Sequence, residues 1–324
     1  EEIRRREYNS RINRVVNYIY NNLHDEDLSH EHLADIAFFS RYHFHRIFKA
    51  MMGETLGAFI KRLRLEKSTA FLSHNPKMTI TEIALECGFS SSSAYARAFK
   101  ERFGMSASDF RKAYYLSYSP KRKLDSKECK LVSKFRERFS NAWQAPAASM
   151  YYIENVDKND SRRLVMEMKK VEVREMPEMN VAYVRHIGPY NEIEDAWGRI
   201  CQWAGPRGLL GNPDQKFLGI YYDNPEVTEP DKLRSDACIT VPEGTRVDGD
   251  IGTQKVPAGK YACALFEIAP DEFGAAWEKF MNEWLPESGY QPDDRLCYEL
   301  YHNNAAEHPE GHFILELCQP VKPL

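Results

Sequence analysis

The stretch IALECGFSSSSAYARAFKERFG, residues 83–104, places four consecutive serines between two segments of helical periodicity. A serine just before an apolar 3.6-residue rhythm is typical of a helix start, because its side-chain oxygen accepts hydrogen bonds from unpaired amides of the first turn. The stretch therefore predicts a helix, a turn and a second helix.

The same pattern occurs once earlier in the chain. LADIAFFS at 33–40 aligns with IALECGFS at 83–90, at an offset of fifty residues. FHRIFKAMMG at 44–53 aligns with YARAFKERFG at 95–104, at an offset of fifty-one. Two copies of one helix-turn-helix pattern are more than chance spacing would produce.

Apolar periodicity and cap residues around the two copies predict seven helices. The first covers 8–24, Ser29 and Ser40 cap the next two, Thr79 or Thr81 opens the second copy, and the last begins near Ser106. A longer helix from Thr55 joins the copies and ends before Asn75 and Pro76. In this connecting helix we expect Ala70 to face inward and Lys61, Arg62 and Arg64 to face solvent.

The charge of the chain is divided unevenly between its halves. Residues 1–150 carry 26 Lys and Arg against 17 Asp and Glu, a net charge of +9. Residues 151–324 carry 18 against 31, a net charge of −13. A basic half favours binding of a polyanion. An acidic half repels a polyanion but is compatible with a cationic ligand.

Other features of the composition argue against several classes of protein. The seven cysteines include no C-x-x-C pair, and the histidines lie at positions typical of a helix surface, so we expect no disulfide framework, metal or cofactor. No phosphate-binding loop or nucleophile elbow is present. No apolar run is long enough for a bilayer, and EEIRRREYNS at 1–10 is no secretory signal, so we expect a cytoplasmic protein with no membrane partner.

In a helix-turn-helix, the second helix lies in the DNA major groove and presents residues near its amino end to the bases. The expected contacts are Arg41, Tyr42, His45 and Arg46 in the first copy and Ser91, Ser92, Ser93 and Arg97 in the second. Arg46 is the expected base reader, because its forked guanidinium suits guanine. The residues of the second recognition helix are small, so we expect this helix to discriminate less between base sequences. Its serine hydroxyls should contact phosphates. Further phosphate contacts are expected from Lys49, Arg62, Arg64 and Lys100.

Residues 8–113 resemble the AraC/XylS transcriptional regulators, and CGFSSSSAYARAFKERFG at 87–104 is the most specific part of the resemblance. The resemblance implies a seven-helix DNA-binding domain, with Tyr42, His45 and Arg46 in the first recognition helix and Ser92, Ser93 and Arg97 in the second. The chain departs from the family pattern at Phe38, where a glycine is usual, and at Ala107, where a proline is usual.

The second half has a mixed pattern with its own repeat. NVAYVRHI and KYACALFEI are typical of strands, and YNEIEDAWGRICQWA and DEFGAAWEKFMNEWL of helices, with matches at an offset of eighty residues. These predict duplicated strand-helix-strand units that build one sheet with the helices on one face, an α+β fold. The expected organisation is an all-α double helix-turn-helix domain at 1–116, a charged linker at 117–167 with one helix at 126–139, and this α+β domain at 168–324.

HIGPYNEIEDAWGRI, GIYYDNPE, WLPESGYQ and CYELYHN resemble the GyrI-like effector-binding domain over about 168–321, and the domain order is similar to that of Rob-type regulators. The resemblance implies a pocket between the two repeats, lined by aromatics and faced by a buried glutamate, which Glu299 matches. Candidate pocket residues beside Glu299 are Tyr190, Trp197, Tyr221, Tyr222, Trp277 and Tyr301.

The residues around Glu299 agree with a ligand site on physical grounds. A strand places Glu299 on one face with Cys297 and Tyr301, where a carboxylate is costly to bury without a positive or donating partner. A lipophilic cation would satisfy both the charge and the ring faces. The alternative is that Glu299 pairs with a lysine, an arginine or a backbone amide, and that the aromatics are core.

These observations predict a cytoplasmic, non-enzymatic transcription factor, an activator that a small ligand modulates. Two recognition helices on one connector could read major-groove segments about 34 Å apart, so one chain could bind promoter DNA as a monomer and act on RNA polymerase. Two alternatives remain. The second half could be a hydrolase or detoxifying enzyme in which Glu299 with Tyr301 or Tyr222 activates water. The chain could also be an architectural DNA protein without a ligand.

Overall fold

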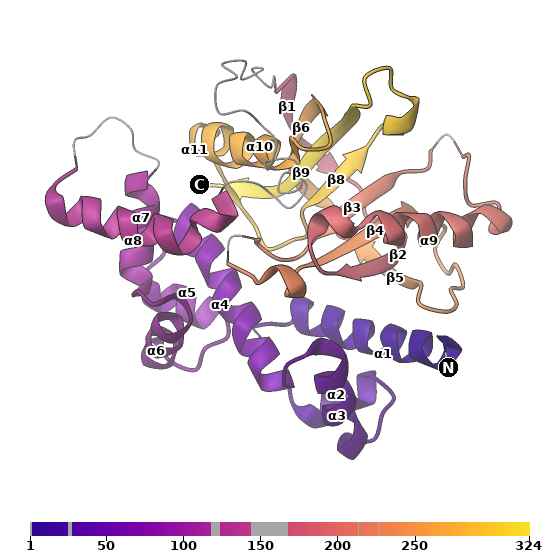
Figure 1. Ribbon diagram of the computed structural model, residues 1–324, viewed down its shortest axis with the longest axis horizontal. Coiled ribbons are helices and arrows are strands. Elements are labelled where there is room, and N and C mark those ends of the chain that lie inside the picture. The colour runs from indigo at the N-terminus through magenta and orange to yellow at the C-terminus, as the bar shows by residue number, and fades with distance from the viewer. Residues whose placement is uncertain (1, 25–27, 118–123, 144–167, 213, 226) are drawn as a thin grey trace. The chain divides into compact units, whose positions relative to one another are not determined.

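The computed structural model of the chain describes residues 2–24, 28–117, 124–143, 168–212, 214–225 and 227–324. The chain forms two compact units, Glu1–Ser140 and Asn141–Leu324. The first unit is helical, and the second is built on one large sheet (Figure 1). Because residues 141–150 carry no charge, the units keep the net charges of +9 and −13.

Within its described residues, the helical unit contains the seven predicted helices followed by one more. They are α1 (Glu2–Asn21), α2 (His30–Ile36), α3 (Arg41–Met52), α4 (Leu56–His74), α5 (Ile80–Glu86), α6 (Ser92–Phe103), α7 (Ala107–Ser117) and α8 (Ser126–Trp143). The first helix begins earlier than the apolar stripe predicts. The predicted helix at 126–139 is present as α8 and is four residues longer.

The segment predicted as a linker, 117–167, is in part packed structure. Phe135 and Phe139 of α8 are buried, and each ring lies 5.2 Å from the ring of Phe110 of α7, centroid to centroid. This aromatic contact makes α8 part of the helical unit, which its charged surface residues conceal in the sequence. Residues 144–167 lie outside the described part of the chain.

Side-chain caps set the starts of the helices in the second copy. Thr79, rather than Thr81, opens α5 with a capping box, in which Thr79 Oγ1 accepts from the Glu82 amide at 3.1 Å and the Glu82 carboxylate accepts from the Thr79 amide at 2.7 Å. Ser91 Oγ accepts from the Ala94 amide of α6 at 3.2 Å. Ser40 precedes α3, but its side chain makes no cap hydrogen bond.

The two copies use different residues at the same point of the turn. Gly88 has φ +77°, and a side chain there would meet the Leu23 carbonyl oxygen at 2.3 Å. Phe38 has φ +53° and is, within the described ranges, the sole non-glycine residue with positive φ. A left-handed conformation costs an L-residue about 1–2 kcal/mol. The first turn is therefore strained where the second, with its glycine, is not.

The helix α4 joins the two copies because its residues pack into both. Near its start, Phe59 contacts Phe48 of α3 with ring centroids 5.4 Å apart. Near its middle, Ser68 Oγ accepts a hydrogen bond from the buried Tyr95 of α6 at 3.1 Å. The 19 residues of α4 correspond to a length of about 28 Å. Both recognition helices are thereby attached to one connector.

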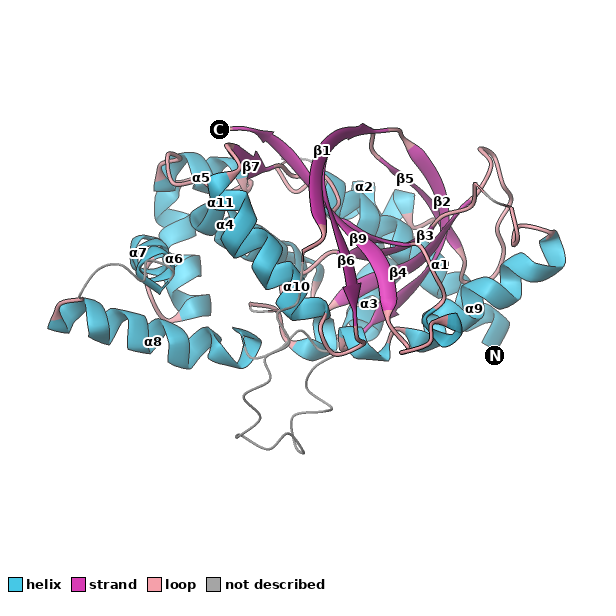
Figure 2. Ribbon diagram, turned by 90° about the horizontal axis from the view of Figure 1, so that it is seen from above, coloured by secondary structure: helices cyan, strands magenta, loops and turns pink. Residues whose placement is uncertain are grey.

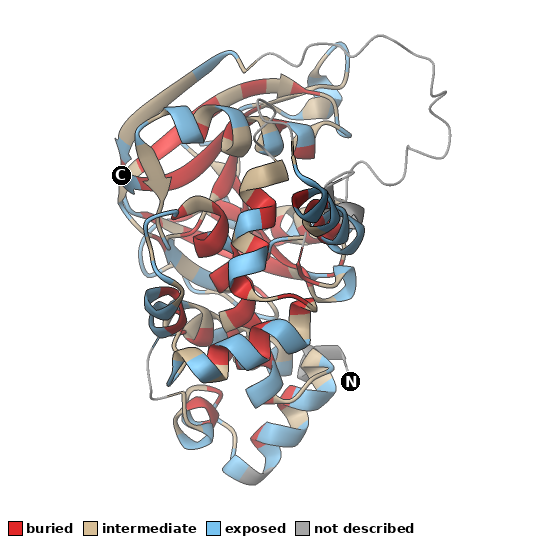
Figure 3. Cartoon of the chain, turned by 90° about the vertical axis from the view of Figure 1, so that its left-hand side faces the viewer, coloured by how far each residue is buried: buried red, intermediate tan, exposed pale blue. Residues whose placement is uncertain are grey.

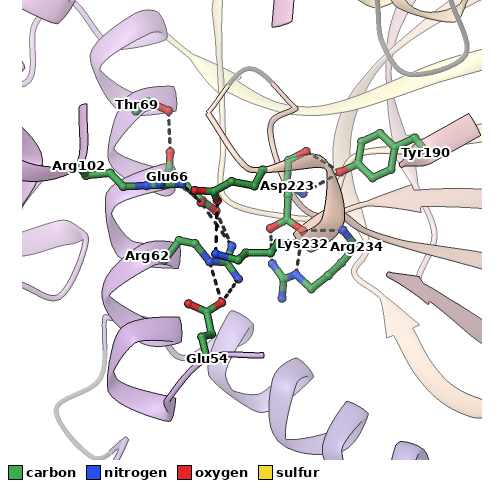
Figure 4. A network of polar contacts seen from close by, with 10 residues as sticks. Glu54, Arg62, Glu66, Thr69, Arg102, Tyr190, Asp223, Lys232 and Arg234 are labelled. Carbon is green, nitrogen blue, oxygen red and sulfur yellow. Dashed lines mark hydrogen bonds and ion pairs between the residues drawn. The ribbon is translucent and has the colours of Figure 1, made fainter. Parts of the chain in front are cut away.

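Packing on both sides also buries polar residues of α4, and two expectations about them are wrong. Arg62 is buried with 6% of its side chain exposed, and it donates to Glu54 at 2.7 Å and to Glu66 at 3.1 Å (Figure 4). Arg64 is half-buried and donates through Nε to the Leu23 carbonyl at 2.9 Å. The Arg62 guanidinium joins α4 to the turn before it, and the Arg64 guanidinium joins α4 to the segment after α1, so neither is an exposed phosphate contact. Ala70, expected to face inward, is exposed.

The second unit is an antiparallel sheet. Its strands are β1 (Lys170–Met176), β2 (Met179–Ile187), β3 (Phe217–Tyr221), β4 (Arg234–Thr240), β5 (Gly252–Val256), β6 (Gly259–Ile268), β7 (Tyr290–Pro292), β8 (Tyr298–Tyr301) and β9 (Phe313–Pro323). In the part of the chain that is described, the order is β1-β6-β9-β8-β3-β4-β2-β5, with β7 paired to β9. The strands are drawn in magenta in Figure 2. Long runs of buried residues follow the strands (Figure 3).

Strand register confirms the repeat of eighty residues. Ala182 of β2 pairs with Ile239 of β4, and Ala262 of β6 pairs with Gln319 of β9, eighty residues later on both strands. The first strand of each repeat is exchanged, because β1 pairs with β6 and β5 pairs with β2. The two repeats meet where β3 pairs with β8.

The helices of the repeats are α9 (Glu194–Ala204) and α10 (Phe273–Lys279), the latter extended by a π-turn and α11 (Leu285–Glu287). Successive register partners across the sheet are Ala182, Ile239, Phe217, Tyr301, Leu315 and Phe266, so these share one face. Ala182 and Ile239 pack with α9, and Leu315 and Phe266 pack with α10. The predicted α+β arrangement with helices on one face is confirmed.

Replacing Arg62 with Ala should lower the free energy of unfolding by roughly 3–5 kcal/mol, because Glu54 and Glu66 lose their buried cation. Lys61→Ala is the control: Lys61 pairs with Glu101, and the two side chains are 49% and 74% exposed. That loss should be about 1 kcal/mol or less. Equal losses for the two variants in urea denaturation would contradict a structural role for Arg62.

Candidate DNA-binding and ligand-binding sites

The outer face of α3 carries most of the expected DNA contacts of the first copy. Arg41, His45, Arg46 and Lys49 are exposed, while Phe44 and Phe48 on the inner face are buried. Arg41 lies 3.4 Å from Glu31 of α2 in an ion pair, and the His45 ring lies 5.8 Å from the His30 ring. Tyr42 lies on α3, but its side chain is outside the described part of the structure.

The second recognition helix, α6, presents shorter side chains. Ser93, Arg97 and Lys100 are exposed, and Ser92 is half-exposed. Ser91 is exposed as well, although its hydroxyl also accepts from the Ala94 amide as the helix cap. Tyr95 and Phe99 form the buried inner face. The fold thus leaves both predicted DNA faces open to solvent and attaches them through α4.

In the second unit, Glu299 is the charged residue in an otherwise apolar row across the sheet. Its register neighbours on the same face are Val184, Ala237, Gly219, Leu317 and Ala264. Glu299 is 2% exposed. The helix face of the sheet therefore encloses a carboxylate among small and aliphatic side chains.

Three aromatic donors satisfy this carboxylate. Tyr301 and Tyr221 donate their hydroxyls to Glu299 Oε2 at 2.6 Å and 3.0 Å, and Trp277 Nε1 donates to Oε1 at 2.8 Å. Burial raises the pKa of Glu299, and the bonds from Tyr301, Trp277 and Tyr221 oppose that rise. The described residues offer Glu299 no Lys or Arg partner, so aromatic donors take the place of the cation that the alternative interpretation requires.

Ring contacts add two aromatic residues of the first repeat to the cluster. Tyr190 packs edge-on against Tyr221 with centroids 4.8 Å apart, and Trp197 packs edge-on against Tyr301 at 5.6 Å. The Tyr190 hydroxyl donates to the Asp223 carbonyl at 2.6 Å (Figure 4). The structure therefore brings six of the seven predicted pocket residues together, namely Glu299, Tyr301, Tyr221, Trp277, Tyr190 and Trp197.

Tyr222 is the seventh residue, and it lies elsewhere. Its hydroxyl donates to Asp236 at 2.7 Å, and its ring lies 4.6 Å from the guanidinium carbon of Arg185. Asp236 and Arg185 are register partners on the face of the sheet away from the helices. Consecutive residues of an extended segment point to opposite faces, so Tyr221 and Tyr222 could not both reach Glu299.

The predictions omitted three phenylalanines that contact the cluster. Phe217 lies 6.4 Å from Trp197, Phe273 lies 6.4 Å from Tyr301, and Phe313 lies 5.9 Å from Tyr301, between ring centroids. Phe217 was detectable from the sequence, because it lies four residues before Tyr221 and so on the same face of the strand. It is also equivalent in the repeat to Cys297, eighty residues later. Phe273 and Phe313 carry no such signal, since they approach Tyr301 through helix and strand packing.

A second acid on the opposite face has a contrasting environment. Glu316 receives two hydrogen bonds from Arg174, at 2.8 Å and 2.6 Å, and His302 lies 3.3 Å away. Burial alone would raise the pKa of Glu316, but hydrogen bonds from His302 and Arg174 outweigh burial and lower it to about 2. Glu316 is thus a structural ion pair, whereas Glu299 is a buried carboxylate without a cation.

None of the helices that the structure describes is long and apolar enough to cross a membrane. Among the same residues, no group of three or more His, Cys, Asp or Glu side chains could hold a metal ion.

Comparisons with known proteins match each unit separately. Residues 169–322 match the GyrI-like small molecule binding domain, and residues 33–113 match a helix-turn-helix domain. The DNA gyrase inhibitor of Serratia proteamaculans (strain 568) is 31% identical over 157 residues, which cover 47% of this chain and 97% of that protein. The DNA gyrase inhibitor of Escherichia coli (strain K12) is 29% identical, with coverages of 47% and 96%.

Solved structures divide in the same way. The EcmrR C-terminal domain has a TM-score of 0.39 at 18% identity and covers 48% of this chain and 98% of that one. The DNA-binding domain of AdpA in complex with a target DNA has a TM-score of 0.32 at 27% identity, with coverages of 34% and 97%.

The two units together define a DNA-binding regulator that carries a small-molecule-binding domain. The chain belongs to the GyrI-like family through its second unit, and its first unit matches a helix-turn-helix domain. This domain arrangement points to a non-enzymatic regulator.

Replacing Glu299 with Gln should stabilise the unliganded protein with a defined pH dependence. Because folding raises the pKa of Glu299, the wild type loses stability as the pH rises from the ordinary Glu pKa of about 4.3 through the folded value. The melting temperature of Glu299→Gln, measured at a series of pH values, should therefore increase relative to wild type over that interval.

Glu316→Gln is the matched control with the opposite sign. Because the pKa of Glu316 is lowered to about 2, the carboxylate stabilises the fold above the ordinary Glu pKa and loses that effect as the pH falls. Glu316→Gln should therefore melt below wild type near neutral pH and approach it in acid. The same pH trend in both variants would contradict the contrast between the two acids.

Proposed function

We propose that this protein is a cytoplasmic transcriptional activator that binds promoter DNA as a monomer, acts on RNA polymerase and responds to a lipophilic cation held at Glu299. The observation that carries the proposal is the pairing of two solvent-facing recognition helices on one connector with a buried, aromatic-ringed carboxylate in the same chain. We assign DNA binding to 1–116 and ligand binding to 168–324.

Binding as a monomer is supported by the length and rigidity of α4. A dimeric helix-turn-helix protein places two recognition helices about 34 Å apart, one turn of the duplex. Here one chain carries two such helices on a connector of about 28 Å. The ion pair of Arg62 with Glu66 lies within α4, and Arg62 also pairs with Glu54 just before the helix. Together with the contact of Glu66 with Arg102 of α6 at 3.6 Å, these pairs resist bending between the copies.

A cationic ligand is supported by the electrostatics of the Glu299 cluster. A desolvated negative charge attracts a positive ligand strongly, because the surrounding medium screens it weakly. The faces of Tyr221, Tyr301, Trp197 and Trp277 offer cation–π contacts. The net charge of −13 on residues 151–324 adds long-range attraction for cations.

Response to the ligand requires that it bind two states of the protein unequally. Glu299 lies on β8, and Tyr221 lies on β3, so the cluster spans the junction of the two repeats. A ligand that contacts both strands would favour one arrangement of the repeats over another. We propose this junction as the element whose arrangement the ligand biases.

Arg46→Ala should cost roughly 1–3 kcal/mol of binding at one base position and relax the preference there. Lys100→Ala is the control, because removing a phosphate-binding side chain from α6 should weaken binding to all sequences alike. Gel-shift titrations against operators selected from random duplexes, and against their single-base variants, measure both effects. An Arg46→Ala protein that keeps the wild-type preference at every position would rule out base reading by Arg46.

The charge requirement of the ligand is tested with a matched pair of probes. Benzyltrimethylammonium and neopentylbenzene have nearly the same shape, but only the first is charged. Wild type should bind the cation about tenfold or more tightly than the hydrocarbon in isothermal titration, and Glu299→Gln should lose most of that preference. Equal affinity of wild type for both probes would exclude a cation-selective site.

A further inference from the structure

The register of the sheet places Gly219 opposite Glu299. The two residues are partners in the β3–β8 pairing, and they are eighty residues apart, which is the offset that relates the two repeats throughout the sheet. They are therefore equivalent positions that face each other across the junction. The pseudo-twofold axis of the unit passes between them.

The rings around this axis occur in equivalent pairs, but the acid does not. Tyr221 and Tyr301 are separated by eighty residues, and so are Trp197 and Trp277. Both tyrosines donate to the same atom, Glu299 Oε2. The site therefore repeats its aromatic groups and carries its carboxylate in one repeat only, with Gly219 at the other position.

The backbone does not explain the glycine at 219. Gly219 is not among the glycines with positive φ, and it lies within a regular strand. Glycine weakens a strand interior, since it adds flexibility and packs no side chain. The explanation is spatial, because a Cβ at 219 would lie 3.1 Å from Cε2 and from the hydroxyl of Tyr221. The Tyr221 ring lies so close that a side chain at 219 would have to displace it by a few tenths of an ångström.

We propose that Gly219 is a positioning residue of the ligand site: it gives Tyr221 room to reach Glu299 across the strand junction, and it keeps the site to one carboxylate. This inference rests on the proposed ligand-binding function of the cluster. A second acid at 219 would place its Cβ about 4.5–5.5 Å from that of Glu299. Two carboxylates at that separation resist ionising together, so the repeated acid would not double the charge. With glycine at 219, both tyrosines donate to the single carboxylate of Glu299, and the site binds a single cation.

The first test is a thermal coupling between Gly219 and Tyr221 in the full chain. Gly219→Ala should lower the melting temperature of the wild type, because the new methyl group displaces the Tyr221 ring. In a Tyr221→Ala background, the same change should have no destabilising effect, because the ring is gone. Equal destabilisation in both backgrounds would overturn the proposal. The double variant also decides the question if Gly219→Ala alone does not fold.

The second test measures the charge state of Glu299, which a purely structural role would not alter. Losing the hydrogen bond from Tyr221 should raise the pKa of Glu299 in Gly219→Ala and in Tyr221→Phe alike. The pH midpoint of benzyltrimethylammonium binding should move upward in both variants, with no further shift in the double variant. An unchanged midpoint in Gly219→Ala, or additive shifts, would overturn the role of Gly219.

Gly198→Ala is the matched control. Gly198 is an exposed glycine of α9, and a Cβ there meets nothing within 4 Å. This variant should keep the wild-type pH midpoint and affinity. If the wild type binds no organic cation, the proposed ligand function fails, and the thermal coupling of Gly219 with Tyr221 still decides the positioning role.

Discussion

The antiparallel pairing of β3 with β8 is the constraint on which the second unit depends. It joins two repeats into one sheet and places Gly219 against Glu299. Because register partners share a face, the pairing decides that Tyr221 from one repeat and Tyr301 from the other meet at one carboxylate. A shift of one residue would move Glu299 to the opposite face, away from α10 and the indole of Trp277. The ligand site is thus a product of strand register as much as of residue identity.

The helical unit depends on a comparable constraint in α4. A connector between two DNA-reading copies must be stiff, and α4 gains stiffness by packing into both copies at once. The consequence is that Arg62 and Glu66 become buried and must neutralise each other, with Glu54 and Arg102 completing the arrangement. Charged residues that a single amphipathic helix would expose are here part of the core, since a helix packed on two sides has little polar face left.

Both units contain internal repeats, and the two copies in each unit differ at a point with a physical consequence. In the helical unit, Phe38 takes a left-handed conformation that Gly88 adopts without strain. In the sheet unit, Gly219 leaves out the acid that Glu299 supplies. The recognition helices diverge as well, with long side chains on α3 and hydroxyls on α6. The two copies in each unit therefore carry different functional side chains. These differences indicate that α3 is the main base reader and that the second sheet repeat supplies the acid.

Periodicity, caps and the two offsets determined the helices of the first unit, the α+β repeat and its single helix face, because these depend on local residue spacing. Glu299 and five aromatic partners were also predictable, because the resemblance to the GyrI-like domain implies a buried glutamate and the residues around Glu299 are apolar and aromatic. Only the tertiary structure decided that Tyr222 faces Asp236, that Arg62 is an internal ion pair, and that α8 packs on Phe110. These outcomes depend on which surfaces meet, and a linear pattern records the polarity of a residue without recording what covers it.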